Sequence, residues 1–380
     1  MDSTDQHRTG DGPQSVALRC ASPRTASPVF PPAIGPAPGL PPTAEASALR
    51  SAGGAWIRRR ALLASLALAA CAPARAPMGP SVVAPAFADD ALVMSDGVRL
   101  PCYGWLPPSR PKAVVVGLHG MNEHARAFAE DAAGWFTAAG VALYAYDQRG
   151  FGGSPNRGIW AGHETMAADA SEAARIIRAR HPGVPVVLMG ESMGGAVLLV
   201  AGTSARRPPV DGYVLLAPAV VGRAALGWFA AGMLDVLVSL VPMMGFQNSA
   251  PGFQPTDNMA AWQRWSRDPL LIRHTRVDAL AGLVDLMEAA VRAAPDFHAP
   301  ALLLYGGRDR LVPARPTRHL LASLPDRSVQ RVGYYPEGWH MLLRDTQGQN
   351  VAGDITAWAC DRTAPLPSGA EDAARLWLAA

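Results

Sequence analysis

The chain has 380 residues, of which 49% are hydrophobic and 17% charged, so it has enough apolar surface for one large globular domain or for a core with an insertion. A formal net charge of only +3 argues against nucleic acid or a strongly acidic molecule as its partner. The four cysteines show neither Cys-x-x-Cys nor Cys/His spacing, which excludes the usual patterns of a zinc site.

The first 71 residues divide into two parts of different composition. Residues 1–55 are rich in proline, alanine, serine, glycine and threonine without sustained periodicity. They cannot bury enough apolar area to offset their ordering entropy and are predicted to be a disordered extension. Residues 56–71 place three arginines at 58–60 before an apolar run at 61–70. That run is shorter than the ~20 residues of a membrane-spanning helix and predicts the apolar region of a signal peptide.

The end of this segment, Leu68-Ala69-Ala70-Cys71, resembles the lipobox of bacterial lipoproteins. In that family the cysteine is lipidated and becomes the mature N-terminus, so the resemblance implies export to the cell envelope and membrane association through a lipid anchor. Residues 72–90 would then form a Pro/Ala-rich tether; without use of the signal, the protein stays in the cytoplasm. Export would also allow Cys102 and Cys360 to pair, although a buried strand position for Cys102 is favoured.

From residue 91 onward, apolar strands alternate with amphipathic helices. Two short strands at 91–94 and 98–106 flank Asp96-Gly97, which predicts a hairpin. Further apolar strands are predicted at 113–119, 141–146, 184–189, 211–217, 301–305 and 329–334, with helices at 126–139, 166–180 and 196–201. This alternation predicts a mostly parallel, doubly wound sheet built from residues 91–219 and 297–360, followed by a C-terminal tail at 361–380.

Residues 220–296 interrupt the alternation and predict a helical cap over the sheet. The segment contains a long apolar run at 224–241, a tryptophan-bearing stretch at 262–265 and a helical pattern at 280–293. Apolar residues on all sides of this cap, with methionines among them, suit a lid that lines an acyl pocket. The alternative is that these residues pack against the core; a membrane-spanning helix is disfavoured because Gly232 and Asp235 interrupt the run.

A Gly-x-Ser-x-Gly pattern, centred on Ser192, stands between a predicted strand and a predicted helix. This is the spacing of a nucleophile elbow, in which the serine occupies a sharp, strained turn. Side chains in place of Gly190 and Gly194 would clash with that turn, and the following helix directs its N-terminal N–H groups at the site. The alternative interpretation is a small-residue turn before an ordinary helix.

Two later residues complete the set that serine acyl transfer needs. Asp309 follows the strand at 301–305, and His340 lies 31 residues later, beyond the last predicted strand. One helix and one strand between them return the chain to the same edge of the sheet, in the order Ser, Asp, His. Among rival residues, His319 is predicted on a solvated helix face, and Asp345 in a surface loop.

Several motifs in this order resemble one enzyme family. They are His119-Gly120-Met121-Asn122-Glu123-His124, the stretch 147–154, the elbow, Gly306-Gly307-Arg308-Asp309, and His340. The chain from about 90 to 360 resembles α/β-hydrolases of the monoacylglycerol lipase and lysophospholipase type, close to the serine aminopeptidase-like clan. The resemblance implies an α/β-hydrolase fold that needs no metal or cofactor. Asp147 and Arg149 are expected to tie loops together through a charge-assisted pair.

The resemblance also implies roles for individual residues. Ser192 would be the nucleophile, His340 the general base and then acid, and Asp309 the group that orients the imidazole. The backbone N–H groups of Met121 and Met193 would form the oxyanion hole. The elbow and the adjoining loop would be supported by His119, Gly120, Gly190 and Gly194.

Two positions depart from the family pattern. Glu191 stands before the nucleophile, where many relatives have histidine, and Asn122 stands where animal monoacylglycerol lipases have glycine. Neither departure removes a catalytic group, but both change local polarity and bear on substrate preference.

The hypothesis from sequence is a serine ester hydrolase that cleaves lipid-like monoesters, monoacylglycerols or lysophospholipids, through an acyl-enzyme intermediate. A small-molecule esterase or an aminopeptidase-like amidase remains open, since Glu191 or an acid of the cap would hold a substrate amine. A lipid-tethered envelope binding protein with an inactive hydrolase fold also remains open. The sequence does not indicate the oligomeric state.

Overall fold

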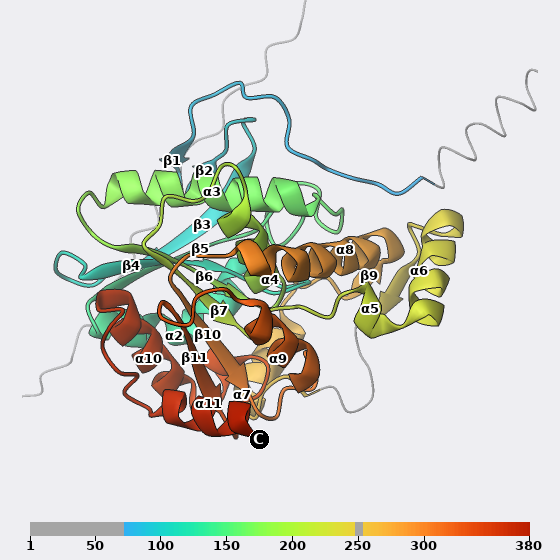
Figure 1. Cartoon of the computed structure of the whole chain (residues 1–380). Helices are drawn as coiled ribbons and strands as arrows, with labels where there is room; N and C mark the ends of the chain where they lie inside the picture. Colours follow the sequence, from blue (N-terminus) through green and yellow to red (C-terminus); the bar gives the residue numbers. More distant parts are fainter. Residues whose placement is uncertain (1–71, 248–253) are drawn as a thin grey trace, which may run out of the picture. The chain divides into compact units, whose positions relative to one another are not determined.

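The computed structural model describes residues 72–247 and 254–380, and the predictions made for residues 1–71 lie outside this part of the chain (Figure 1). Its centre is a nine-stranded sheet in the order β1-β2-β3-β5-β4-β6-β7-β10-β11. The strands are β1 Ala86–Ala88, β2 Ala91–Val93, β3 Arg99–Trp105, β4 Ala113–Leu118, β5 Val141–Tyr146, β6 Val186–Glu191, β7 Gly212–Leu216, β10 Ala301–Gly306 and β11 Gln330–Tyr335. Strands β5 to β11 of this order are parallel, whereas β1, β2 and β3 form an antiparallel edge.

Helices cover both faces of the sheet, which confirms the predicted doubly wound architecture. The helices of the core are α2 Ala125–Ala138, α3 His163–Arg180, α4 Met193–Thr203, α9 Ala314–Ser323, α10 Gly348–Cys360 and α11 Ala370–Ala379. Strand β4 shows the two layers: Val114 and Val116 face the apolar cluster that includes α3 and α4, whereas Val115 faces the cluster that includes α2 and α10. All six residues of β4 are buried, as expected for a central parallel strand.

The crossover order reverses beside β4. This strand pairs with β5 on one side and with β6 on the other, so the chain winds away from it in both directions. Ligands of open α/β sheets bind in the crevice at such a switch point, beyond the carboxyl ends of the strands. The loops after β4 and β6 therefore meet where a site is expected.

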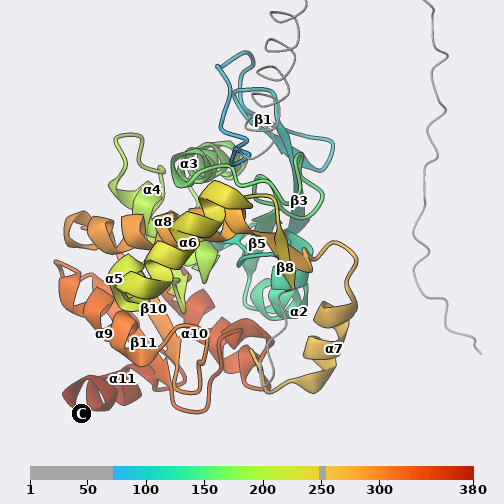
Figure 2. The ribbon, with the colours of Figure 1, turned by 90° about the vertical axis from the view of Figure 1, so that its right-hand side faces the viewer.

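The segment 220–296 is a mixed cap rather than a purely helical one. It comprises α5 Arg223–Leu226, α6 Trp228–Leu240, β8 Gly245–Gln247, α7 Met259–Arg267, β9 His274–Arg276, α8 Val277–Ala293 and η1 Ala294–Asp296. β8 and β9 form a two-stranded antiparallel sheet. Helix α8 belongs to the core layer, because Leu286 and Ala290 are fully buried within it. Figure 2 shows α6 lying across α8, with α7 on the other side of β8.

The segments at the two ends of the described core pack against it. In the Pro/Ala-rich stretch 72–90, the N–H of Ala74 donates to Asp278 Oδ2 (2.9 Å) and the N–H of Ala76 to the carbonyl of Trp160 (3.1 Å). This stretch is therefore a strap held on the core, although the sequence predicts a tether. The tail at 361–380 contains α11, whose Trp377 stacks on Tyr334 with 4.8 Å between ring centroids.

The hairpin predicted at Asp96-Gly97 is confirmed, since β2 and β3 pair in antiparallel fashion and Gly97 has a φ of +81°. Cys102 is buried in β3, as favoured from sequence, while Cys360 is exposed, and both thiols are free. Across 72–247 and 254–380, no helix has the length and apolar character needed to cross a membrane.

The packing of α8 against Trp160 can be tested by comparing two helical glycines, one in contact with this residue and one without close neighbours. A Cβ at Gly282 in α8 would lie 2.4 Å from the buried indole of Trp160, whereas a Cβ at Gly232 in α6 meets nothing within 4 Å. Overpacking costs about 1–3 kcal/mol, more than the ~0.5–1 kcal/mol that alanine gains over glycine in a helix. We expect Gly282→Ala to lower the free energy of unfolding and Gly232→Ala to raise it slightly, as measured by urea denaturation. A stabilised Gly282→Ala variant would contradict this packing.

Candidate active site

The nucleophile elbow predicted at Ser192 has the expected strained geometry. Ser192 lies between β6 and α4 with φ +53° and ψ −113°, a conformation that side-chain-bearing residues rarely adopt. A Cβ on Gly190 would lie 2.4 Å from the carbonyl carbon of Gly194, and one on Gly194 would lie 2.3 Å from the carbonyl oxygen of Leu118. Both positions therefore require glycine, because real Cβ contacts are never so short.

Asp309 and His340 meet at the carboxyl ends of neighbouring parallel strands, β10 and β11. Asp309 Oδ2 lies 2.8 Å from His340 Nδ1. The other oxygen, Oδ1, accepts hydrogen bonds from the N–H groups of Leu311 (2.8 Å) and Val312 (3.0 Å), which fixes the carboxylate on its loop. The structure thus brings together the acid and the histidine that the sequence singles out.

The charge of Asp309 controls the protonation of His340. Burial disfavours the charged ring, but the Asp309 carboxylate outweighs this effect through its charge and hydrogen bond, so the pKa of His340 is raised above its usual value. A histidine in this setting can accept a proton at Nε2 while Nδ1–H stays bound to the carboxylate.

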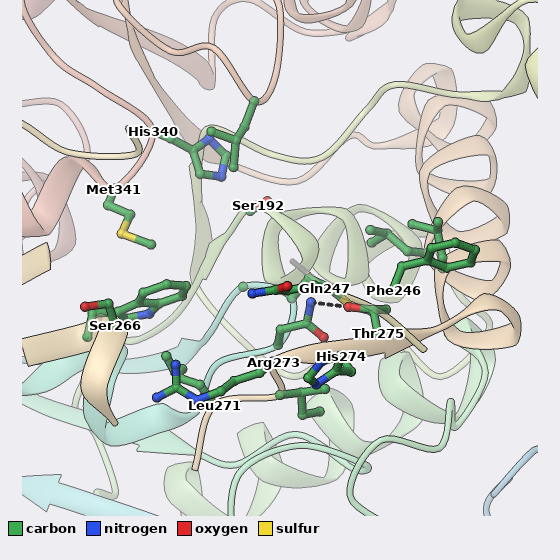
Figure 3. A pocket seen from close by; sticks show the side chains of 18 of the residues that line it. Ser192, Phe246, Gln247, Ser266, Leu271, Arg273, His274, Thr275, His340 and Met341 are labelled. Carbon is green, nitrogen blue, oxygen red and sulfur yellow. Dashed lines mark hydrogen bonds between the residues drawn. The ribbon is translucent and has the colours of Figure 1, made fainter. Parts of the chain in front are cut away.

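Ser192 and His340 both line one cavity of about 590 Å³ (Figure 3). Gly120 and Met121, which follow β4, line it as well. Met193 is the first residue of α4, directly after Ser192, so its N–H has no partner within its own helix. The oxyanion role of Met121 and Met193 stays a prediction.

The wall of this cavity is mostly apolar and comes from the second half of the cap. Apolar lining residues are Phe246, Trp262, Trp265, Leu271, Ile272, Leu280, Leu283, Leu311 and Met341. Among the described residues that line the cavity, none belongs to α6. The cap therefore does line a cavity, as the sequence suggests, but through its later residues; in α6, Leu234 is the buried residue and Trp228 is 87% exposed.

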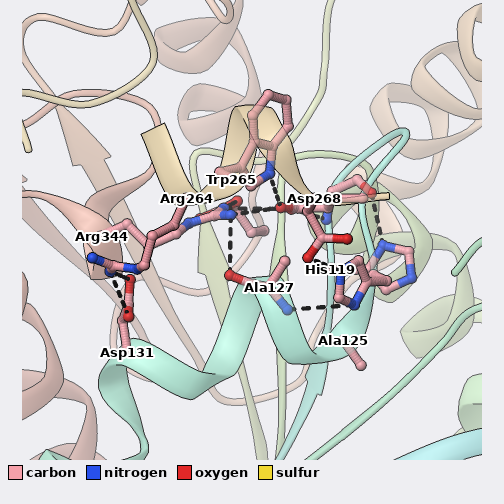
Figure 4. A network of polar contacts seen from close by, with 12 residues as sticks. His119, Ala125, Ala127, Asp131, Arg264, Trp265, Asp268 and Arg344 are labelled. Carbon is pink, nitrogen blue, oxygen red and sulfur yellow. Dashed lines mark hydrogen bonds and ion pairs between the residues drawn. The ribbon is translucent and has the colours of Figure 1, made fainter. Parts of the chain in front are cut away.

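A buried ion-pair cluster lies beneath the elbow, and the sequence analysis missed it. Arg344 lies in η2 (Leu342–Arg344) and donates from Nη1 to Glu123 Oε2 (2.5 Å) and from Nη2 to Glu191 Oε1. Trp265 Nε1 also donates to Glu123 Oε2 (3.0 Å), and the N–H of Gly120 donates to Glu123 Oε1 (2.8 Å) (Figure 4). The arginine directly after the apolar run 341–343 was the one sequence signal that a buried charge was present.

The two carboxyl groups of this cluster differ in their affinity for protons. The pKa of Glu123 is lowered to about 2, because the Arg344 charge and hydrogen bonds outweigh the opposing effect of burial. Burial raises the pKa of Glu191 to about 8; Arg344 opposes this rise and the Glu123 charge adds to it.

Histidine side chains hold the loop after β4, as the sequence predicts. His119 Nδ1 lies 2.8 Å from the carbonyl oxygen of Gly120, and the N–H of Gln148 donates to His119 Nε2 (3.0 Å), which makes Nδ1 the protonated nitrogen. His124 caps α2 and donates from Nε2 to Asp268 (2.9 Å). These contacts fix the loop and leave neither ring aimed at proton transfer.

The expected pair between Asp147 and Arg149 is wrong, because each residue has other partners. Asp147 accepts from the N–H groups of Ala125 (2.8 Å) and Gly153 (2.7 Å). Arg149 forms ion pairs with Asp96 and Asp169, both at 2.9 Å. Both residues still fix loops: Asp147 accepts hydrogen bonds from backbone N–H groups, and Arg149 forms ion pairs with two carboxylates.

The surface assignment of Asp345 is also wrong. Its side chain is buried, and its Oδ2 accepts the N–H of Trp339 (2.7 Å), next to His340. Burial raises the pKa of Asp345 to about 6, although the Trp339 N–H opposes the rise. His319 is exposed on α9, as predicted. Within the described ranges, no group of three or more His, Cys, Asp or Glu side chains is placed to hold a metal ion.

Comparison with known proteins identifies the family to which this chain is similar. The family model described as serine aminopeptidase, S33 matches residues 109–347. The monoacylglycerol lipase of Mycolicibacterium smegmatis is 30% identical over 281 residues, which cover 69% of this chain and 93% of that protein. Human monoglyceride lipase is 29% identical, covering 72% of this chain and 90% of its own length.

Solved structures share the fold. The crystal structure of Paleococcus ferrophilus monoacylglycerol lipase is 25% identical, covers 70% of this chain and 99% of that one, and has a TM-score of 0.55. A soluble variant of Saccharomyces cerevisiae monoglyceride lipase is 15% identical, covers 77% of this chain and 100% of that one, and has a TM-score of 0.61. The expected α/β-hydrolase fold is thereby confirmed.

The Asp309–His340 contact yields a direct spectroscopic test. In Asp309→Asn, burial of the imidazolium is no longer offset by the adjacent carboxylate, so we expect the pKa of His340 to fall. An NMR titration of the ring measures it. Asp326→Asn, in the turn before β11, is the control and is expected to leave that pKa unchanged. An unaltered His340 titration in Asp309→Asn would show that another group controls the ring.

Proposed function

Since the chain belongs to the serine aminopeptidase S33 family and is a carboxylic ester hydrolase, we propose that its substrates are lipid-like monoesters, namely monoacylglycerols or lysophospholipids. The observation that carries the proposal is the apolar cavity of about 590 Å³ that begins at Ser192 and His340. A cavity of this size and lining suits one acyl chain, with the ester at its polar end. The names of the relatives, monoacylglycerol and monoglyceride lipase, support the same substrate class.

The proposed mechanism uses an acyl-enzyme intermediate. Ser192 Oγ attacks the ester carbonyl carbon while His340 Nε2 accepts its proton, and Asp309 stabilises the imidazolium. The N–H groups of Met121 and Met193 donate to the oxyanion of the tetrahedral intermediate. The alcohol leaves with the proton from His340, and water, activated by the same ring, then releases the fatty acid and restores the serine.

Ser192→Ala tests the nucleophile. Removal of the serine of such a triad costs on the order of 10⁶ in turnover, so we expect loss of ester hydrolysis and of fluorophosphonate labelling with the fold intact. Ser266→Ala is the matched control, because Ser266 lines the same cavity but its hydroxyl donates to the carbonyl of Gln263. Labelling that persists in folded Ser192→Ala would refute the assignment, and absence of labelling in the folded parent protein would favour an inactive binding protein.

An acyl-chain profile tests the substrate class. We expect kcat/KM for p-nitrophenyl esters to rise from acetyl to medium and long chains, because each buried CH₂ contributes ~0.8 kcal/mol of binding. Monoacylglycerol and lysophosphatidylcholine then separate the two leaving groups. Faster cleavage of an aminoacyl anilide than of any ester would favour the amidase alternative. A preference for acetyl esters would favour the small-molecule esterase.

We also propose export and lipid anchoring through Cys71, an assignment supported by the sequence pattern at 68–71. The exposed apolar side chains of α6, with Trp228 87% and Phe229 65% exposed, support a location at a lipid surface. Metabolic labelling with an alkyne fatty acid and membrane fractionation provide the test, with Cys71→Ser expected to lose both signals. Unlabelled protein in the cytoplasmic fraction would overturn the proposal.

A further inference from the structure

One guanidinium serves two carboxyl groups directly behind the elbow. The side chains of Glu123, Arg344 and Glu191 are 3%, 2% and 1% exposed. They come from three separate places in the fold: the loop after β4, η2 and the last residue of β6. With both carboxylates ionised, this enclosed cluster would carry one uncompensated negative charge, which is costly to bury.

The hydrogen bonds show which carboxyl group is the better stabilised anion. Glu123 accepts from Arg344, from Trp265 Nε1 and from the N–H of Gly120. Glu191 is contacted by Arg344 through Oε1, and its Oε2 is buried without a hydrogen-bond partner among the described residues. A proton on Glu191 therefore removes the excess charge at the smallest cost.

The charges around Glu191 come from three directions. Arg344 faces it from η2, Glu123 from the loop after β4, and His340 from the loop after β11. His119, at the end of β4, faces Glu123. Arg344 and a protonated His340 favour the ionised form of Glu191, whereas burial and Glu123 favour the neutral form and prevail, with a pKa of about 8.

We propose that Glu191 is a positioning residue that acts in its neutral form, an inference that rests on the function proposed above. While it is neutral, Glu191 only accepts a hydrogen bond from Arg344, and the Arg344 charge is balanced by Glu123, which holds the Gly120 N–H and so keeps the oxyanion loop in place. Ionisation of Glu191 competes for Arg344 and adds a negative charge one residue from Ser192, where the transition state itself becomes anionic.

Glu191→Gln tests the inference, because the amide keeps the shape of the neutral acid and cannot ionise. The parent enzyme is expected to lose kcat for p-nitrophenyl butyrate above pH about 8, the pKa of Glu191. In Glu191→Gln we expect neutral-pH activity to persist and this high-pH loss to vanish. Glu172→Gln is the control: Glu172 is buried away from the site, accepts the N–H of Ser95 (2.8 Å), and should leave the profile unchanged.

Two outcomes would overturn the inference. The first is a pH profile of kcat in Glu191→Gln that is identical to that of the parent. The second is a collapse of kcat at neutral pH in folded Glu191→Gln, which would show that the ionised carboxylate is needed. Infrared spectroscopy adds a readout that does not depend on activity. The protonated-carboxyl band of the parent at pH 7 should lose most of its intensity in Glu191→Gln, because Asp345, with a pKa of about 6, is mostly ionised at that pH. In the parent the band should fade as the pH rises further, and equal bands in the parent and Glu191→Gln at pH 7 would also refute the inference. A parent protein without esterase activity would instead contradict the proposed function, and the infrared band would still be informative.

The link to the oxyanion loop has its own test. Arg344→Met frees Glu123, so we expect a fall in kcat of about 10²–10³, the value of one oxyanion donor, with KM little changed. Thermal unfolding and the conservative Arg344→Lys variant, expected to recover part of kcat, separate this effect from misfolding. A rise in KM alone would refute the positioning role.

Discussion

The site depends on one close approach between two backbone segments. The start of α4 lies so near the end of β4 that a Cβ on Gly194 would fall 2.3 Å from the carbonyl oxygen of Leu118. This contact fixes the turn that holds Ser192 at φ +53°, and it sets the elbow against the loop that begins at His119. Because β4 and β6 are adjacent parallel strands, Ser192 and the loop after β4 emerge side by side at the same edge of the sheet.

Buried charged side chains next to the elbow stabilise the loops that carry Ser192 and His340. Asp309 is bound by two loop N–H groups on one oxygen and by His340 on the other, and Asp345 holds the neighbouring Trp339 N–H. Arg344 connects η2 to both the loop after β4 and the end of β6. Three segments far apart in sequence, namely η2, the loop after β4 and the end of β6, are thus tied together by buried charges.

Short sequence patterns predict those strands and turns whose geometry depends on residues close to one another in the sequence. The apolar run at 141–146 matches β5 residue for residue, and the Gly-x-Ser-x-Gly spacing identifies the elbow because steric clashes there involve near neighbours. Arg344 and Asp345 were missed or misassigned because their burial depends on partners such as Glu123, more than 200 residues away from Arg344. Within the cap, hydrophobicity alone does not distinguish a helix that lines the cavity from one that faces the surroundings: α6 exposes Trp228, whereas Leu280 and Leu283 of α8 line the cavity.

The strap that precedes β1 gives the protein a mechanical property. Ala74 is bound to Asp278 at the first turn of α8, and the N–H of Asp278 in turn donates to the carbonyl of Pro242, just after α6. A force applied to the chain before Ala74 is therefore transmitted first to α8 and the adjoining cap, and only afterwards to the sheet. Since Leu280 and Leu283 of α8 line the cavity, tension at the N-terminal side acts on one wall of that cavity.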